Sequence, residues 1–148
     1  MVVPCYNEEQ VLEETTKQLL DKYKTLMERG CITKSSRILY VNDGSKDQTW
    51  PIINRLYEEN EWVSGLNLSR NRGHQNAVLA GLMYAKDHCD AAISMDADLQ
   101  DDIDAIDEMV EKFRQGIDVV YGVRSDRKKD TFFKKFTAEG FYKFMKWM

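Results

Sequence analysis

The sequence predicts an α/β domain built on a mostly parallel sheet flanked by helices. Short apolar runs alternate along the chain with longer segments of helical periodicity, and no hairpin turn joins two neighbouring runs. Parallel strands need crossover connections, which the intervening helices supply. The length of 148 residues fits one such domain, and 43% apolar residues are enough for its core.

The first half of the chain contains three predicted strands and two predicted helices. Residues 1–5 form an apolar run, and 7–29 follow with apolar residues on one helical face until Gly30 ends the helix. A β-branched run at 38–41 predicts the second strand. Residues 47–60 are expected to be helical, with Pro51 tolerated in the first turn, and 63–68 form the third strand.

The second half is expected to continue the alternation. A third helix over 74–88 places Val78, Leu82 and Ala85 inward. The remaining predicted strands are 91–95 and 117–123, and the remaining predicted helices are 102–115 and 131–148. We therefore expect a domain over residues 1–124, followed by a helical segment over 125–148.

Charge is distributed unevenly between these two parts. The net charge is −4, and residues 124–148 carry eight basic and three acidic side chains, or +5, which leaves −9 for residues 1–123. An acidic body argues against general nucleic-acid binding. Aromatic residues at 11% and only two prolines exclude a disordered chain, and the longest apolar runs are far shorter than the roughly 18–20 residues of a membrane span.

Ligands of parallel sheets bind at the carboxyl ends of the strands, so the residues that follow each predicted strand are the candidate site. Asp96 and Asp98 follow the 91–95 run and, two positions apart in an extended segment, point the same way. Two close carboxylates favour a bound Mg²⁺ or Mn²⁺, and Gln100 shares their parity. The alternative is that Asp98 caps the next helix and Asp96 ends the strand. A calcium loop is excluded because Asp101 stands where glycine is needed.

Two other strand ends carry candidate binding residues. Asp43, in the segment Asn42-Asp43-Gly44-Ser45, offers a carboxylate to a ribose or a base N–H, although an ordinary turn explains the segment equally well. The segment from Pro4 to Glu8 contains Tyr6, which can stack on a base; its alternative is a helix start capped by Asn7. Neither glycine-rich phosphate loop, Gly-x-x-x-x-Gly-Lys or Gly-x-Gly-x-x-Gly, is present in the chain.

Taken in order, these segments resemble the family 2 glycosyltransferases of the GT-A fold, and within them the branch of dolichol-phosphate-mannose synthase and bacterial polyprenyl-phosphate glycosyltransferases. The matching segments are residues 3–8, 41–47, 68–77, 80–82, 95–101 and 122–124. Two positions depart from the family: Asp102-Ile103 replaces a common proline pair, and Arg72 replaces a common aromatic residue.

The resemblance implies a Rossmann-like fold with a nucleotide site at the carboxyl ends of the strands, and it implies a role for each matched residue. The residues that would bind the nucleotide sugar are Pro4, Tyr6, Asn7, Glu8, Val41, Asp43, Asp96 and Ala97. The metal ligands would be Asp96, Asp98 and Gln100, holding Mg²⁺ or Mn²⁺. Asp98 and Arg124 would be the catalytic residues, with Arg124 at the diphosphate or the transferred sugar.

The function implied is a metal-dependent, inverting transfer of a sugar to a polyprenyl phosphate, from a UDP-sugar rather than GDP-mannose. Two alternatives stay open: the acceptor is a polysaccharide or cell-wall glycan, or the chain is a nucleotide-binding fragment inactive without a missing C-terminal part.

The basic segment 125–148 places aromatic residues and lysines on a predicted helix, a pattern typical of a membrane surface. The alternative is a helix that covers the domain with solvated lysines. In the resembling branch this segment approaches the bilayer, and transmembrane helices often follow. The resemblance thus implies part of a longer protein at the cytoplasmic face of a membrane, anchored beyond residue 148; it leaves the oligomeric state open.

Overall fold

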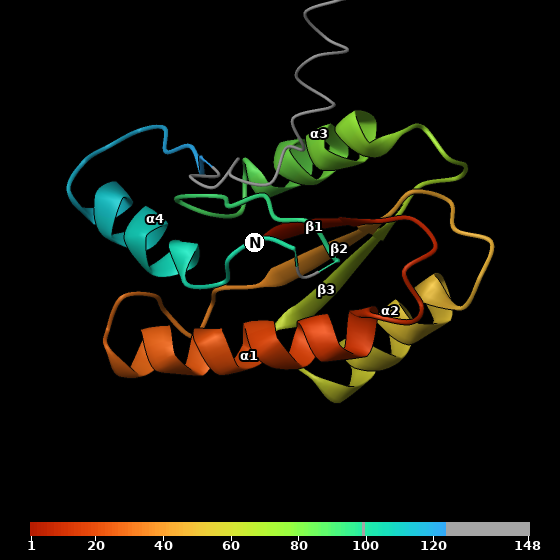
Figure 1. Ribbon diagram of the computed structural model, residues 1–148, viewed down its shortest axis with the longest axis horizontal. Helices are drawn as coiled ribbons and strands as arrows, with labels where there is room; N and C mark the ends of the chain where they lie inside the picture. Colours follow the sequence, from red (N-terminus) through yellow and green to blue (C-terminus); the bar gives the residue numbers. More distant parts are fainter. Residues whose placement is uncertain (99, 124–148) are drawn as a thin grey trace, which may run out of the picture.

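In a computed structural model of the protein, residues 1–98 and 100–123 are described. They form an α/β domain (Figure 1). The strands are β1 (Val2–Cys5), β2 (Ile38–Asn42) and β3 (Val63–Asn67). The helices are α1 (Leu12–Glu28), α2 (Thr49–Glu59), α3 (His74–Ala85) and α4 (Ala105–Arg114). The predicted α/β class and parallel sheet are confirmed, and the first three strands lie where the sequence places them.

The strands pair in the order β1-β2-β3, and both pairs are parallel. Val2 lies opposite Leu39 in the first pair, and Ile38 lies opposite Val63 in the second. The strand predicted at 91–95 is shortened to a single parallel bridge between Ser94 and Val2, on the edge of β1 away from β2. All carboxyl ends therefore point to the same edge of the sheet.

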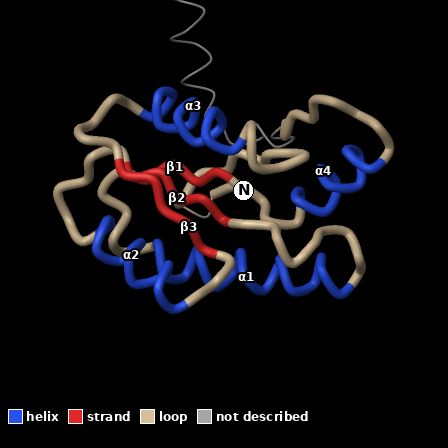
Figure 2. The backbone as a smooth tube through the Cα atoms, turned by 180° about the vertical axis from the view of Figure 1, so that it is seen from behind, coloured by secondary structure: helices blue, strands red, loops and turns tan. Residues whose placement is uncertain are grey.

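The helices cover both faces of the sheet, with α1 and α2 on one side and α3 on the other (Figures 1 and 2). Side-chain alternation along the strands divides the core accordingly. Val3 and Tyr40 pack on the side of α1 and α2, whereas Val2 and Val41 pack with α3. Strands β1 and β2 are buried on both faces, which explains why their sequences are continuous apolar runs rather than alternating ones.

Helix α3 approaches the sheet closely because it carries glycine at position 81. A Cβ atom at Gly81 would lie 2.4 Å from Cγ1 of Val2 and 2.8 Å from Cγ2 of Val41. Such distances lie far inside ordinary van der Waals contact between carbon atoms, about 3.5–4.0 Å. The absent side chain thus sets how near α3, and the residues at its N-terminus, come to β1 and β2.

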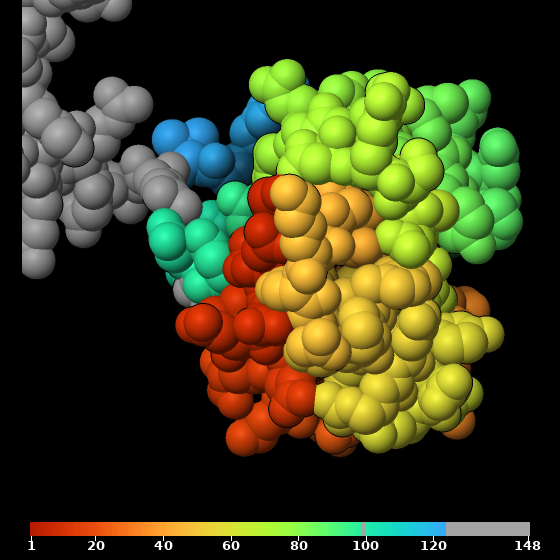
Figure 3. All heavy atoms as spheres, turned by 90° about the vertical axis from the view of Figure 1, so that its right-hand side faces the viewer, coloured from red at the N-terminus to blue at the C-terminus, as the bar shows by residue number. Residues whose placement is uncertain are grey.

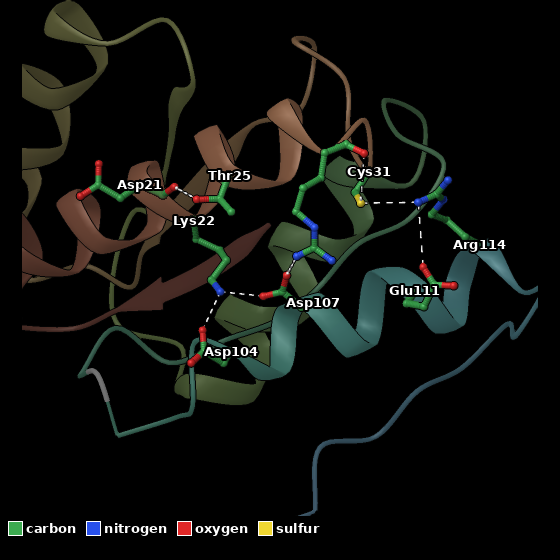
Figure 4. A network of polar contacts seen from close by, with 9 residues as sticks. Asp21, Lys22, Thr25, Cys31, Asp104, Asp107, Glu111 and Arg114 are labelled. Carbon is green, nitrogen blue, oxygen red and sulfur yellow. Dashed lines mark hydrogen bonds and ion pairs between the residues drawn. The ribbon is translucent and has the colours of Figure 1, made fainter.

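Helix α4 is held against α1 by charged side chains as well as by the buried Ile106 (Figure 4). Lys22 of α1 donates to the carboxylates of Asp104 and Asp107, at 2.6 Å each, and Arg29 also pairs with Asp107. The side chains of Lys22 and Asp107 are 12% and 24% exposed, so their contact is better shielded from water than the one to Asp104, which is 83% exposed.

The strand predicted at 117–123 is absent from the structure. This segment follows α4 as irregular chain whose apolar side chains face solvent, including Val119 (63% exposed) and Tyr121 (83% exposed). An apolar β-branched run becomes a strand only beside a partner strand, and none lies next to it in the described chain. The helix predicted at 131–148 lies outside the described residues. In the part that is described, no helix has the length and apolar character to cross a bilayer.

Candidate functional site

A cavity of about 220 Å³ opens at the carboxyl edge of the sheet. Figure 3 faces this edge and shows atoms of the N-terminal residues, of the region around residue 43 and of α3 side by side. The lining residues lie at or after the ends of β1, β2, β3 and the Ser94 bridge, or belong to α3: Pro4, Cys5, Tyr6, Glu8, Asp43, Asn71, His74, Ala77, Asp96, Ala97 and Asp98. The structure therefore brings together most of the residues that the sequence predicts for nucleotide and metal.

The loop after β1 is tied to the loop after β2. Asn7 adopts a left-handed backbone conformation (φ 58°), which asparagine tolerates better than most residues. Its N–H donates to Oγ of Ser45 at 3.0 Å, and its Oδ1 accepts the N–H of Lys46 at 2.9 Å. The N–H of Glu8 donates to Oγ1 of Thr49 at 2.8 Å. These bonds hold Tyr6 and Glu8 at the cavity. The alternative interpretation of Asn7 as a helix cap is wrong, because α1 begins only at Leu12.

Asp43 directly follows β2 and is buried, at 2% exposure. Its Oδ1 accepts the N–H of Arg72 at 2.6 Å, and its Oδ2 accepts the N–H of Gly73 at 2.9 Å. Gly44 (φ 65°) follows where a Cβ atom would lie 2.5 Å from the carbonyl carbon of Arg70. The carboxylate therefore holds the loop before α3, and the glycine lets that loop pass close by.

The Asp96-Ala97-Asp98 segment has the predicted alternation. Met95 and Ala97 are buried at 6% and 3% exposure, whereas Asp96 and Asp98 are exposed and line the cavity. The N–H of Gln100 donates to Oδ1 of Asp98 at 3.0 Å, which stabilises the turn after it. Both carboxylates thus face the same cavity.

Negative charge accumulates on this side of the cavity. Partial burial raises the pKa of Glu8, and the carboxylates of Asp98, Asp47 and Asp96 raise that pKa further. This mutual repulsion fits a divalent cation. Among the described residues no three His, Cys, Asp or Glu side chains converge as a metal cage. Two open carboxylates are nevertheless the donor set that Mg²⁺ uses when phosphate oxygens complete its shell, so the residues present fit the ion.

The opposite wall of the cavity comes from the end of β3 and the start of α3, which contribute Asn71, His74 and Ala77. The ring Nε2 of His74 lies 3.7 Å from Oδ1 of Asp96. No role was predicted for these residues from the sequence. The rule that ligands bind where parallel strands end would have indicated Asn71 and His74, since both follow the third predicted strand.

Three of the predicted site residues that the structure describes, Asn7, Val41 and Gln100, do not line the cavity. Val41 is fully buried in the core beneath α3, and Gln100 is exposed but does not line the cavity. Arg124 lies outside the described residues. Nothing in the structure tests the binding roles of these residues, which stay predictions.

The family follows from comparison with known proteins. Residues 1–147 match the family model described as "Glycosyl transferase family 2". The chain belongs to this family. The resemblance inferred from the motifs is confirmed, and with it the assignment of the chain as a glycosyltransferase domain.

Curated relatives of the chain are named as glycosyltransferases. The chain is 52% identical over 145 residues to YkoT of Bacillus subtilis, named an uncharacterized glycosyltransferase, covering 98% of this chain and 43% of the relative. It is 41% identical over 144 residues to the bactoprenol glucosyl transferase of Shigella phage SfV, covering 97% and 44%. The chain thus spans less than half the length of these relatives.

Solved structures confirm the fold. TarS of Staphylococcus aureus, residues 1–349 in complex with UDP, superposes with a TM-score of 0.58 at 16% identity. The match covers 84% of this chain and 37% of the TarS chain. At this identity the likeness concerns the fold, which is the GT-A fold expected from the sequence motifs.

Proposed function

We propose that this domain binds a nucleotide sugar together with Mg²⁺ or Mn²⁺, and that the whole protein transfers the sugar to a polyprenyl phosphate. The observation that carries the proposal is the cavity at the carboxyl edge of the sheet. It combines an aromatic ring (Tyr6), a buried carboxylate (Asp43) and a pair of open carboxylates (Asp96 and Asp98). These are the groups required by a base, a ribose and a metal-bound diphosphate.

The nucleoside is expected to bind between the ends of β1 and β2. Tyr6 is 40% exposed and can stack on a base, while each oxygen of Asp43 accepts one backbone N–H and keeps a second lone pair for a base N–H or a ribose hydroxyl. A UDP-sugar is the favoured donor, because the related fold of TarS holds UDP. Pro4, Glu8 and Ala97 also line this part of the cavity.

The diphosphate is expected beside Asp96 and Asp98, which would hold the metal, with Gln100 as a further ligand. A bound Mg²⁺ or Mn²⁺ supplies the positive charge that neutralises the leaving nucleoside diphosphate. Arg124 is proposed to interact with the diphosphate or the transferred sugar. A lipid phosphate is already anionic near neutral pH, so it can attack the anomeric carbon without a strong base from the protein. A single displacement of this kind inverts the anomeric configuration.

The acceptor is proposed for the whole protein. Several relatives at 41% identity are named bactoprenol glucosyl transferases, and bactoprenol is a polyprenyl lipid. A lipid acceptor requires the active site to work at a membrane surface, and the basic segment 125–148 suits an anionic one. We therefore place the enzyme at the cytoplasmic face of a membrane.

Isothermal titration calorimetry with UDP and GDP, with and without Mn²⁺, tests the donor site. We expect UDP to bind more tightly with Mn²⁺, and Asp98→Asn to abolish this gain because it removes a charged ligand. Asp90→Asn is the matched control, since Asp90 is exposed and does not line the cavity. If the affinity for UDP does not depend on Mn²⁺, or if the Mn²⁺-dependent gain is unchanged in Asp98→Asn, the metal assignment is contradicted.

The acceptor requires the full-length protein. Incubation with a radiolabelled UDP-sugar and bacterial membranes should transfer label into a butanol-extractable lipid. Label that enters only polymer insoluble in butanol would assign a glycan acceptor instead.

A further inference from the structure

The turn that carries Asp96 and Asp98 is held by helix α1, and one buried hydroxyl makes the contact. The sheet holds this segment only as far as Met95, whose N–H donates to the carbonyl of Val2 at 3.1 Å. Two residues after Met95, the carbonyl of Ala97 accepts a hydrogen bond from Oγ1 of Thr15 at 2.7 Å. Thr15 is 1% exposed, and the two residues are 82 positions apart in the chain.

Thr15 is a polar residue on the apolar face of α1. A buried hydroxyl costs free energy unless it is hydrogen-bonded, and the carbonyl of Val11, at 3.0 Å within the same helix, already offers an acceptor. Because the hydroxyl carries a single proton, the two carbonyls compete for it, and the shorter contact, to Ala97, is the one that links α1 to the turn. Its acceptor is the carbonyl of the peptide that joins Ala97 to Asp98. Because a peptide unit is planar, holding this carbonyl orients the backbone of Asp98.

The chain that follows the turn is held by the same helix. Lys22 lies seven residues after Thr15, which is about two helical turns, or roughly 10 Å along α1. Its ammonium group pairs with Asp104 and Asp107 at the start of α4 (Figure 4). Helix α1 therefore spans the segment between residues 97 and 104 and contacts both of its ends.

We propose that Thr15 is a positioning residue that presents the carboxylates of Asp96 and Asp98 to the metal and the diphosphate. The inference rests on the proposed function, because it assigns these carboxylates to the metal. Helix α1 is the rigid support, and the hydroxyl of Thr15 transmits its position to the turn. Groups that orient metal ligands typically change metal affinity by about 10- to 100-fold when they are removed.

Thr16 offers a matched control. It is 2% exposed, and its hydroxyl also bonds within α1, to the carbonyl of Leu12 at 2.7 Å, and across the core, to the hydroxyl of Tyr40 at 2.7 Å. Thr15→Val and Thr16→Val therefore each delete one buried hydroxyl from the same helix at nearly constant volume. Only the first removes a contact with the Asp96–Asp98 turn.

The experiment compares Thr15→Val, Thr15→Ser and Thr16→Val. In calorimetry we expect Thr15→Val to raise the Kd for UDP in the presence of Mn²⁺ by about tenfold and to leave metal-free binding within about twofold. Thr15→Ser keeps the hydroxyl and restores the affinity. Thr16→Val lowers the melting temperature but retains the Mn²⁺-dependent affinity. Equal losses in both valine variants, or no loss in Thr15→Val, overturn the proposal.

Hydrogen exchange without metal or nucleotide separates this inference from the proposed function. The amides of Asp96, Ala97 and Asp98 should exchange faster in Thr15→Val than in Thr16→Val. Equal exchange at these amides overturns the positioning role. If the unaltered chain fails to bind UDP with Mn²⁺, the proposed function fails, and the exchange comparison still decides whether Thr15 holds the turn.

Discussion

Replacing Gly81 by alanine sets two effects of known size against each other. Alanine in a helix interior is favoured over glycine by about 1 kcal/mol. The added methyl group, however, would lie 2.4 Å from Val2 and 2.8 Å from Val41, two buried β-branched side chains with little freedom to move. Overpacking of this kind costs about 1–3 kcal/mol, and two contacts this short place the cost at the upper end.

The net expectation for Gly81→Ala is a loss of about 1–2 kcal/mol in the free energy of unfolding, or a melting temperature lower by roughly 3–6 °C. Urea unfolding followed by circular dichroism measures the first quantity, and calorimetry measures the second. Because α3 carries His74 and Ala77 into the cavity, nucleotide affinity should fall as well. A higher melting temperature would refute the reasoning, since helix propensity would then outweigh the clash.

A double-mutant cycle with Val2→Ala identifies the clash as the cause. Val2→Ala alone deletes buried methyl groups and should destabilise the chain. In the Gly81→Ala background the same change also makes room for the new methyl group, so its cost should be smaller by about 1 kcal/mol. Additive effects would show that the two positions are not coupled, contrary to the contact at 2.4 Å.

Two further predictions concern pH. Hydrogen bonds from Lys22 lower the pKa of Asp107, and Arg29 adds to the effect. The Asp107 carboxylate therefore stabilises the fold above its unfolded pKa of about 4, and this contribution is lost as pH falls through the lowered folded pKa. In urea unfolding, Asp107→Asn should make the free energy of unfolding less dependent on pH at acidic pH, and an unchanged dependence contradicts the assignment. Burial and then the charge of Asp98 raise the pKa of Glu8, so Asp98→Asn should lower that pKa in an NMR titration while Asp90→Asn leaves it unchanged.

The helices and strands that were predicted correctly are those in which the order of apolar residues along the sequence reflects which side chains are buried. The apolar runs that became β1 and β2 are buried on both faces, and the face of α1 that carries Leu19 and Leu26 is buried as predicted. The alternation through Asp96 and Asp98 was also predictable, because it depends only on extended backbone geometry. These features follow from the residues of each segment alone.

The run at 117–123 shows where local pattern fails. Its β-branched and apolar residues suit a strand. Strand formation, however, depends on hydrogen bonds to a neighbouring strand, and the sequence of the run does not determine whether one lies beside it. The prediction of a strand at 91–95 is only partly correct for the same reason, because in the described residues this run pairs with β1 through a single bridge to Val2.

By itself, the sequence determined the fold class, the family and the carboxylates that face the cavity, because motifs and periodicity are local properties. Tertiary structure decided which strand ends meet there, and it added Asn71 and His74 to the cavity. It also decided that Thr15, which the sequence places among the core residues on the apolar face of α1, donates a hydrogen bond to the carbonyl of Ala97. That contact joins residues 82 positions apart, and only the folded chain brings them within hydrogen-bond distance.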